Sequence, residues 1–191
     1  MTKTRELPPA RTSGGLPLME AIARRRSARE FAQRPLDDQV LSDLLWAAFG
    51  VNGPDGGRTA PYARHILAIE VHAAMADGVW LYDPKAHALI QHSEADIRGE
   101  TGEEPYVASA PLNLVYVAHG ELLKEMSAEE ARLNAGVDAG FIGENVYLFC
   151  ASAGLATVFR GALDARRLGR ALKLPAELFV TYAQSVGYPH A

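Results

Sequence analysis

The chain has 191 residues, of which 48% are hydrophobic and 22% charged, and its net charge is −4 at pH 7. This length suits one domain with a substantial core, and the acidic balance argues against a general affinity for nucleic acid. No stretch approaches the roughly 20 apolar residues of a membrane span, and the single cysteine agrees with a reducing compartment. We therefore expect no membrane contact and a cytoplasmic location.

The first third of the chain predicts two helices separated by loops. Residues 1–15 are rich in Pro, Thr, Arg and Gly and are expected to form a loose arm. An apolar-periodic segment predicts a helix over 17–25. A second helix is predicted over 37–50, capped by one of the two aspartates at its start and ended by a glycine. Glycine, proline, asparagine and aspartate crowd residues 52–61, which indicates a loop.

The middle of the chain predicts strands. Residues 65–72 alternate in part and end in β-forming residues, which indicates a strand. Strands at 79–82 and 88–91 flank Asp-Pro-Lys, a sequence typical of a hairpin turn. Ser93 is expected to cap a short helix that ends at Arg98.

A buried strand and a long apolar helix are predicted next. Residues 112–118 form a nearly continuous apolar run, the pattern of a strand buried on both faces. Residues 127–133 predict a polar helix. The strongest helix is expected at 138–153, and because it is apolar nearly all round it should lie in a core or at a subunit interface. Three glycines in this region would admit another backbone: Gly136, Gly140 and Gly143.

The last third of the chain completes an α+β pattern. A strand is predicted at 155–159, a helix at 164–172 with an aspartate cap, and a final strand at 178–186. Helices mixed with hairpin-like strand pairs indicate an α+β fold, in which helices flank a central mixed, mostly antiparallel sheet. Residues 16–191 are expected to form a single domain.

Four arginines and a serine lie within residues 24–29 of this acidic chain. Such a local basic cluster indicates one anionic group held at one place, because the guanidinium fork and a serine hydroxyl both suit phosphate. The alternative is a solvated helix end that complements the helix dipole. Metal-ligand spacings and glycine-rich nucleotide motifs are absent, so neither a metal site nor a Rossmann unit is expected.

Several segments, in this order along the chain, resemble the flavin-dependent nitroreductase family. The similarity covers most of the chain and is nearest to a compact branch related to the SagB-type oxidoreductases. The matching segments are 22–31, 44–52, 58–61, 110–117, 140–148, 154–158 and 185–189. The resemblance implies a nitroreductase-like fold and a homodimer with FMN at its interface. The long apolar helix and the basic cluster agree with these two expectations.

The resemblance also implies roles for residues in the basic cluster. Arg25 and Ser27 are expected to contact the FMN phosphate, with Arg26 assisting or pairing with an acidic neighbour. Arg29 matches the basic position that reaches the ribityl chain or the N1–C2 carbonyl edge of the ring, where a fixed cation favours the reduced flavin. A surface salt bridge is the alternative for Arg29. The family's basic C-terminal residues are missing from this chain, so the cluster should carry more of the anchoring.

Two further segments match flavin-contacting parts of the family. The loop Pro61, Tyr62, Ala63, Arg64 and His65 is expected to meet the pyrimidine edge from the partner subunit. It departs from the family, which commonly has serine and asparagine where this chain has tyrosine and histidine. The alternative for this loop is an ordinary solvated loop end.

The last matching segment is Val158, Phe159, Arg160 and Gly161, whose backbone N–H groups are expected near flavin N5 and O4. The Arg160 side chain occupies a position that is acidic in several family members. It would either attract an anionic substrate or nicotinamide phosphates, or point to solvent.

The resemblance implies an FMN-dependent NAD(P)H oxidoreductase. NADH or NADPH would reduce the flavin, and a nitroaromatic, quinone or similar small-molecule acceptor would then be reduced in a ping-pong sequence, with no catalytic side chain required. Two alternatives stay open: a flavin-dependent dehydrogenase of SagB type, and a non-enzymatic flavin-binding module.

Overall fold

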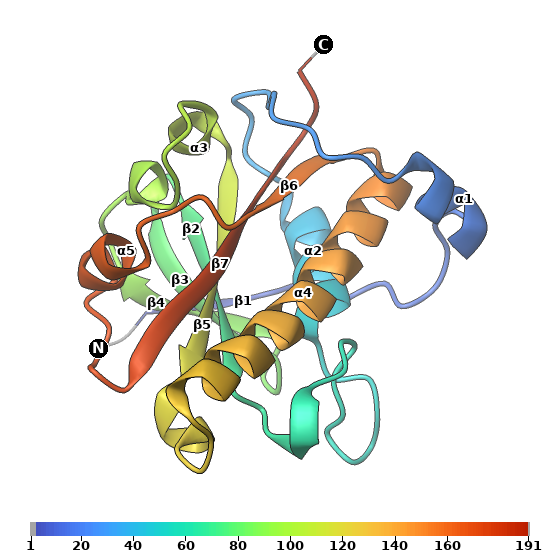
Figure 1. Ribbon diagram of the computed structural model, residues 1–191. Coiled ribbons are helices and arrows are strands. Elements are labelled where there is room, and N and C mark those ends of the chain that lie inside the picture. The colour runs from blue at the N-terminus through green and yellow to red at the C-terminus, as the bar shows by residue number, and fades with distance from the viewer. Residues whose placement is uncertain (1–2, 191) are drawn as a thin grey trace.

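The computed structural model describes residues 3–190 as an antiparallel sheet between helices (Figure 1). The strand order is β1-β4-β3-β2-β5-β7-β6. The predicted α+β fold is confirmed, but the expected mixture of strand directions is not, because every pair of neighbouring strands in the described chain is antiparallel. The strands are β1 (Thr4–Glu6), β2 (Ile69–Met75), β3 (Gly78–Asp83), β4 (Ala88–Ser93), β5 (Leu112–His119), β6 (Ala156–Arg160) and β7 (Leu178–Gly187).

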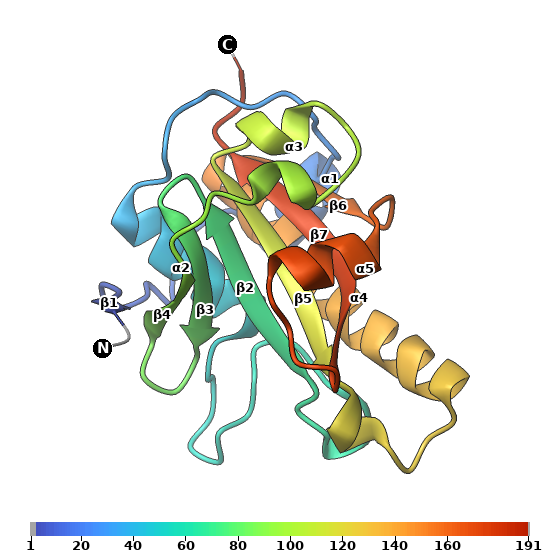
Figure 2. The ribbon, with the colours of Figure 1, turned by 90° about the vertical axis from the view of Figure 1, so that its left-hand side faces the viewer.

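Helices cover both faces of the sheet (Figure 2). The long helices α2 (Asp38–Phe49) and α4 (Ala128–Ala153) pack on one face over the larger apolar core. On the other face, α5 (Ala165–Ala171) covers a smaller apolar cluster. The remaining short helices are α1 (Leu18–Arg24), η1 (Ala63–His65), η2 (Arg98–Glu100), α3 (Tyr106–Ser109) and η3 (Gly120–Leu123). No helix in residues 3–190 has both the length and the apolar character needed to cross a membrane.

Helix α4 is one continuous element, so the predicted division at Asp138 is wrong. The helix starts at a capping box in which Ser127 Oγ accepts from Glu130 N–H and the Glu130 carboxylate accepts from Ser127 N–H. Asp138 starts no helix; it lies buried inside α4, where its carboxylate accepts a hydrogen bond from Ala63 N–H. Gly154 ends the helix at φ 70°, a left-handed conformation that suits glycine.

Three other predicted elements differ from the structure. The strand expected at 65–72 begins at Ile69 because a 3-10 turn occupies 63–65. Ser93 caps no helix: β4 extends through it, and its hydroxyl accepts from Ala95 N–H in a turn. Part of the expected loose arm is ordered, since β1 pairs with β4 and the Arg11 side chain forms an ion pair with Asp43. Residues 1, 2 and 191 lie outside the described chain.

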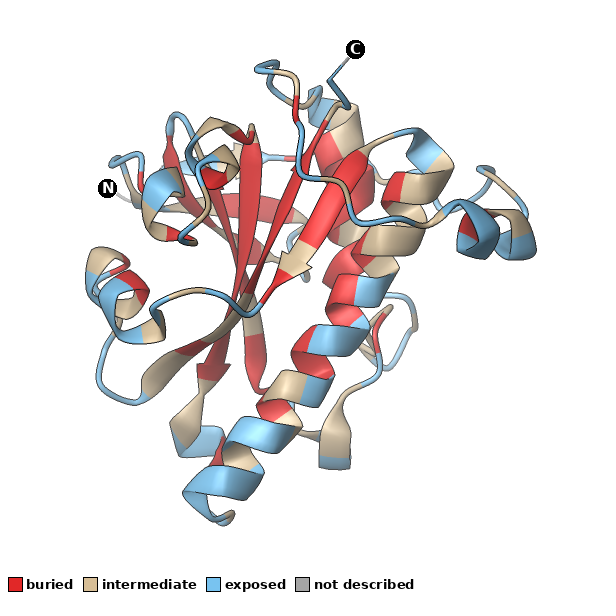
Figure 3. Cartoon of the chain, turned by 45° about the horizontal axis from the view of Figure 1, so that its top comes forward, coloured by how far each residue is buried: buried red, intermediate tan, exposed pale blue. Residues whose placement is uncertain are grey.

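The two faces of α4 have different environments (Figure 3). Ala139, Ile142 and Val146 are fully buried against the sheet. The opposite face carries large apolar side chains in the open: Leu133 is 67% exposed, Val137 45% and Phe141 44%. These three residues repeat every fourth position and therefore form one stripe on the helix.

The glycines of α4 do not all have the role expected from the sequence. A Cβ at Gly143 would lie 2.4 Å from the Phe159 ring, so this glycine makes room for a side chain of its own chain. A Cβ at Gly136 would meet the Tyr182 ring, whereas Gly140 faces open space. Only Gly140 therefore keeps the expected freedom for a second backbone to approach.

Candidate functional site

The basic cluster leaves the helix and runs beside β6. Helix α1 ends at Arg24, whose side chain forms an ion pair with Glu20 on the same helix. Beyond it, Ala28 N–H donates to Thr157 O at 2.9 Å. The segment that follows α1 is therefore held against the free edge of β6. Arg25 is the C-cap residue of α1, with its N–H donating to Ala21 O, whereas Ser27 and Arg29 belong to the extended segment beyond the helix.

Tyr147 connects the basic cluster to the segment Val158–Gly161. Its hydroxyl lies 2.7 Å from Ser27 Oγ and accepts a hydrogen bond of 2.9 Å from Phe159 N–H. The Arg25 guanidinium lies over the Tyr147 ring, 5.2 Å from its centroid. Tyr147 belongs to a motif that suggested the family, but its sequence context carries no signal for this bridging position.

The side chains of Arg25 and Arg26 differ in what they contact. Arg26 Nη1 donates to the backbone carbonyls of Ala23 and Arg25, at 3.2 and 2.7 Å. Neither Arg25 nor Arg26 forms an ion pair with a carboxylate within residues 3–190. The acidic neighbour considered for Arg26 is therefore absent from the described chain, and the Arg25 guanidinium is available to an anion.

The Arg160 side chain is buried, so neither expectation for it is correct. It is 4% exposed, and it donates to Thr101 O at 2.6 Å and to Asn113 Oδ1 at 3.1 Å. Strand alternation places Arg160 on the face of β6 opposite to Phe159. Its backbone, at the end of β6, stays next to the exposed Gly161.

Three buried polar atoms that lack a well-formed hydrogen bond belong to residues around Tyr106, and Arg29 also lies close to that tyrosine. They are Glu104 Oε2, Tyr106 Oη and Arg160 Nε. Burial raises the pKa of Tyr106, and the Glu104 charge adds to this effect, while the nearby charges of Arg160 and Arg29 oppose it. Burial likewise lowers the pKa of Arg160, against the charges of Tyr106 and Glu104. Because unpartnered buried polar atoms are costly, they fit a polar ligand edge at this place.

The loop Pro61–His65 lies apart from the basic cluster. It is fixed where Ala63 N–H donates to Asp138 Oδ1 at 2.9 Å. Asp138 and Tyr147 are nine positions apart on α4, which separates the two regions by about 14 Å along the helix. Arg64 and His65 both have positive φ, at 52° and 58°. Consecutive left-handed residues are strained, and such strain is concentrated at functional sites.

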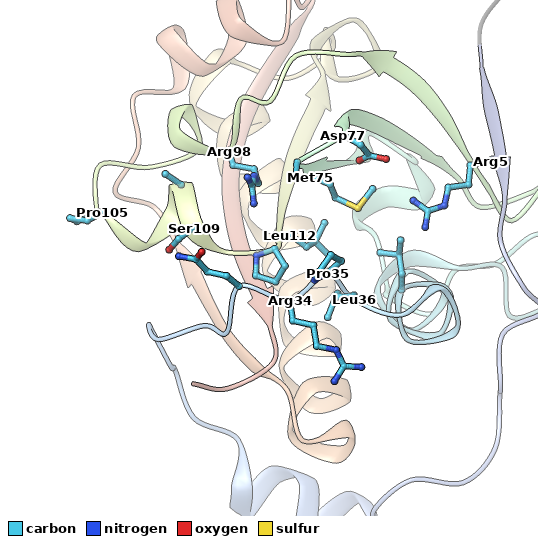
Figure 4. Close-up of a pocket in the computed structure, with 15 residues that line it drawn as sticks. Arg5, Arg34, Pro35, Leu36, Met75, Asp77, Arg98, Pro105, Ser109 and Leu112 are labelled. Carbon is cyan, nitrogen blue, oxygen red and sulfur yellow. The ribbon is translucent and has the colours of Figure 1, made fainter. Parts of the chain in front are cut away.

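A hollow of about 700 Å³ lies between α3, the β2–β3 turn and residues 33–36 (Figure 4). It contains none of the site residues expected from the sequence. Apolar side chains such as Leu36, Met75 and Leu112 form much of its wall. The arginines at this hollow are already ion-paired, Arg5 with Asp38, Arg34 with Asp37, and Arg98 with Asp96.

Comparisons with known proteins agree with this geometry. The Nitroreductase family model matches residues 22–188. A Methanocaldococcus jannaschii protein named "Putative nitroreductase MJ1384" is 28% identical over 167 residues, which are 82% of this chain and 84% of that protein. A crystal structure of a "putative nitroreductase" from Ralstonia eutropha JMP134 is 42% identical and superposes with a TM-score of 0.93 over 98% of this chain and 90% of that one.

A more distant structure shares the fold. The NADPH:FMN oxidoreductase from Vibrio harveyi, solved in complex with NAD+, is 22% identical, with a TM-score of 0.68 over 91% of this chain and 69% of that one. The fold expected from the sequence is thereby confirmed.

Proposed function

The chain belongs to the nitroreductase family, and on that premise we propose that it binds FMN and uses NADH or NADPH to reduce a small-molecule acceptor such as a nitroaromatic or a quinone. The observation that carries this proposal is the contact between the basic cluster and β6. Ala28 and Ser27 attach the cluster to Thr157 and, through Tyr147, to Phe159. The basic cluster is thus placed beside the outer edge of β6, near the exposed Gly161 that follows this strand.

The phosphate of FMN is assigned to the Arg25 guanidinium and the Ser27 hydroxyl. Both lie at the Tyr147 side chain, which fixes their direction. A guanidinium without a carboxylate partner suits a phosphate, because charge-assisted bonds to phosphate oxygens are stronger than neutral ones. Arg26 supports this arrangement from behind, since its side chain donates to the backbone at the end of α1.

The polar edge of the flavin ring is assigned to Arg29 and Tyr106. These side chains are close enough that Arg29 opposes the increase in the pKa of Tyr106. The Tyr106 hydroxyl accepts at most a weak hydrogen bond from Arg29, which leaves its proton free to be donated to a ring carbonyl. Arg29 adds a cation where negative charge develops on reduction.

FMN, when bound, would supply the redox chemistry by carrying a hydride between NAD(P)H and the second substrate. The chain itself would bind the flavin, orient it and shield it from solvent. Phe159 N–H already donates to Tyr147, so the exposed Gly161 at the end of β6 is the backbone group assigned to the flavin edge. The buried Arg160–Asn113–Thr101 hydrogen bonds hold that strand end in place. No side-chain acid or base is needed for this assignment.

We assign the exposed stripe of α4 to a homodimer interface. Leu133, Val137 and Phe141 would lose their solvent exposure there. In a dimer built on α4, the strained loop Pro61–His65 would serve the partner's flavin site, which accounts for its separation from the chain's own basic cluster. Tyr62 and His65, whose rings lie 6.5 Å apart at 86°, would then face the partner's flavin.

Flavin content tests the proposal. We expect the purified protein to be yellow and to release close to one FMN per chain on denaturation. If FMN is lost during purification, the colourless protein should regain it on incubation with free FMN. A colourless protein that takes up neither FMN nor FAD would contradict the proposal.

A further inference from the structure

A second cleft, of about 650 Å³, lies between α4, α5 and β7. This volume falls within the range of small-molecule sites, roughly 300–1,000 Å³. Strand β6 pairs only with 183–187 of β7, so residues 178–182 have no strand beside them on that side and form one wall of the cleft. Phe179 and Tyr182 contribute half-buried aromatic rings, and Leu174 adds aliphatic surface.

Three arginines surround this cleft, and no aspartate or glutamate lines it. Arg166 and Arg170 are one helical turn apart on α5, so their charges lie on the same face of that helix, and Arg132 lines the cleft from α4. None of the three side chains forms a hydrogen bond or ion pair within residues 3–190. The hollow beside α3 differs in this respect, because each of its arginines has a carboxylate partner.

The nearest acidic side chain on α5 is already engaged. The Asp164 carboxylate caps the helix by accepting from the N–H groups of Arg166 and Arg167, at 3.0 and 2.9 Å. These backbone bonds lower the pKa of Asp164, and the charges of Arg170 and Arg167 lower it further. Asp164 therefore reduces the repulsion among the cations only from a distance. Like charges held together without a partner are unfavourable, and a bound anion would remove that repulsion.

We propose that this cleft binds an aromatic phosphate ester, with the aromatic body on Phe179 and Tyr182 and the phosphate among Arg132, Arg166 and Arg170. Three guanidiniums suit the two negative charges of a phosphate monoester better than they suit the one charge of a carboxylate. Apolar and aromatic side chains with a few charged groups are the usual composition of such sites. The proposal does not depend on a bound flavin, because none of the assigned flavin contacts lines the cleft.

Calorimetric titration with 1-naphthyl phosphate tests this site. The protein used should carry one FMN per chain, which fills the other phosphate site, and be freed of unbound FMN, because FMN is itself an aromatic phosphate ester and an excess would compete for the cleft. We expect saturable binding that weakens about tenfold in Arg166→Ala and in Arg170→Ala. Arg167→Ala is the matched control, because Arg167 is on the same helix but pairs with Glu100 and does not line the cleft. The affinity of this variant for 1-naphthyl phosphate should stay within about twofold of the wild-type value. The substituted arginines are exposed, so unchanged melting curves will verify folding.

Two further ligands separate the parts of the recognition. If nucleotides are a natural source of the phosphate, adenosine monophosphate should bind through the same arginines. If other aromatic esters are the source, 1-naphthyl phosphate should bind and adenosine monophosphate should not. Neutral 1-naphthol and inorganic phosphate should each bind more weakly than the ester. The proposal is overturned if the ester does not bind, if 1-naphthol binds as tightly, or if Arg166→Ala and Arg170→Ala bind it as the wild type does. If the protein takes up no flavin, Arg25→Ala replaces bound FMN as the means of removing the other phosphate site.

Discussion

Replacing Arg25 with alanine should weaken FMN binding about 10- to 100-fold, as expected for the loss of a charge-assisted hydrogen bond to phosphate. Arg25 lies over the Tyr147 ring and has no carboxylate partner in the described chain. Its guanidinium is therefore directed by the fold toward the same place as the Ser27 hydroxyl. The dissociation constant can be measured by titrating flavin-free protein with FMN and following the flavin fluorescence.

Arg24→Ala is the matched control for this substitution. Arg24 is the preceding residue, but its side chain forms an exposed ion pair with Glu20 on α1. Its removal should change FMN affinity by no more than about twofold. Arg25→Lys should restore only part of the affinity, because lysine keeps the charge but loses the planar fork. Equal FMN affinity in Arg25→Ala and the wild type would show that the cluster is an ordinary basic surface and not the phosphate site.

Val137→Glu should separate the proposed dimer into monomers and release FMN. Val137 lies in the middle of the exposed stripe of α4, so a monomer can accommodate glutamate there without a clash. In an apolar interface the unpaired carboxylate costs about 3 kcal/mol or more, which raises the dimer dissociation constant at least about 100-fold. Light scattering coupled to size exclusion measures the mass, and the absorbance of the same peak measures flavin.

Ala95→Glu is the control for added negative charge. Ala95 is exposed in the loop that follows β4, away from α4, so this variant should keep the mass and flavin of the wild type. A wild-type protein that is already monomeric and flavin-bound would contradict the interface assignment. So would a Val137→Glu protein that stays dimeric, since the stripe would then lie outside the contact.

The order of the elements could be predicted from local sequence patterns, but contacts across the chain could not. Hairpin residues marked β3 and β4, and Asp164 and Gly154 marked the ends of helices correctly. The division of α4 was wrong because Asp138 resembles a helix cap locally. Its partner, Ala63 N–H, lies 75 positions away, and no local pattern reveals such a bond.

The candidate site was foreseeable in the same uneven way. The arginines and Ser27 could be identified because their clustering is visible in one short segment. Tyr106 and Tyr147 could not, since each acquires its position from partners brought together by the fold, Arg29 for the first and Phe159 for the second. Arg160 was misjudged because an arginine near a strand end usually reaches solvent, whereas the terminal nitrogens of this one donate to Thr101 and Asn113 in the core.

The most direct test is an anaerobic titration of the flavin-bound protein with NADH and with NADPH, followed by the flavin absorption spectrum. We predict that at least one of the two bleaches the oxidised flavin band with about one equivalent per chain. Subsequent addition of a nitroaromatic or a quinone should restore the band and consume the stored electrons. A bound flavin that neither nicotinamide reduces would contradict the proposed oxidoreductase function.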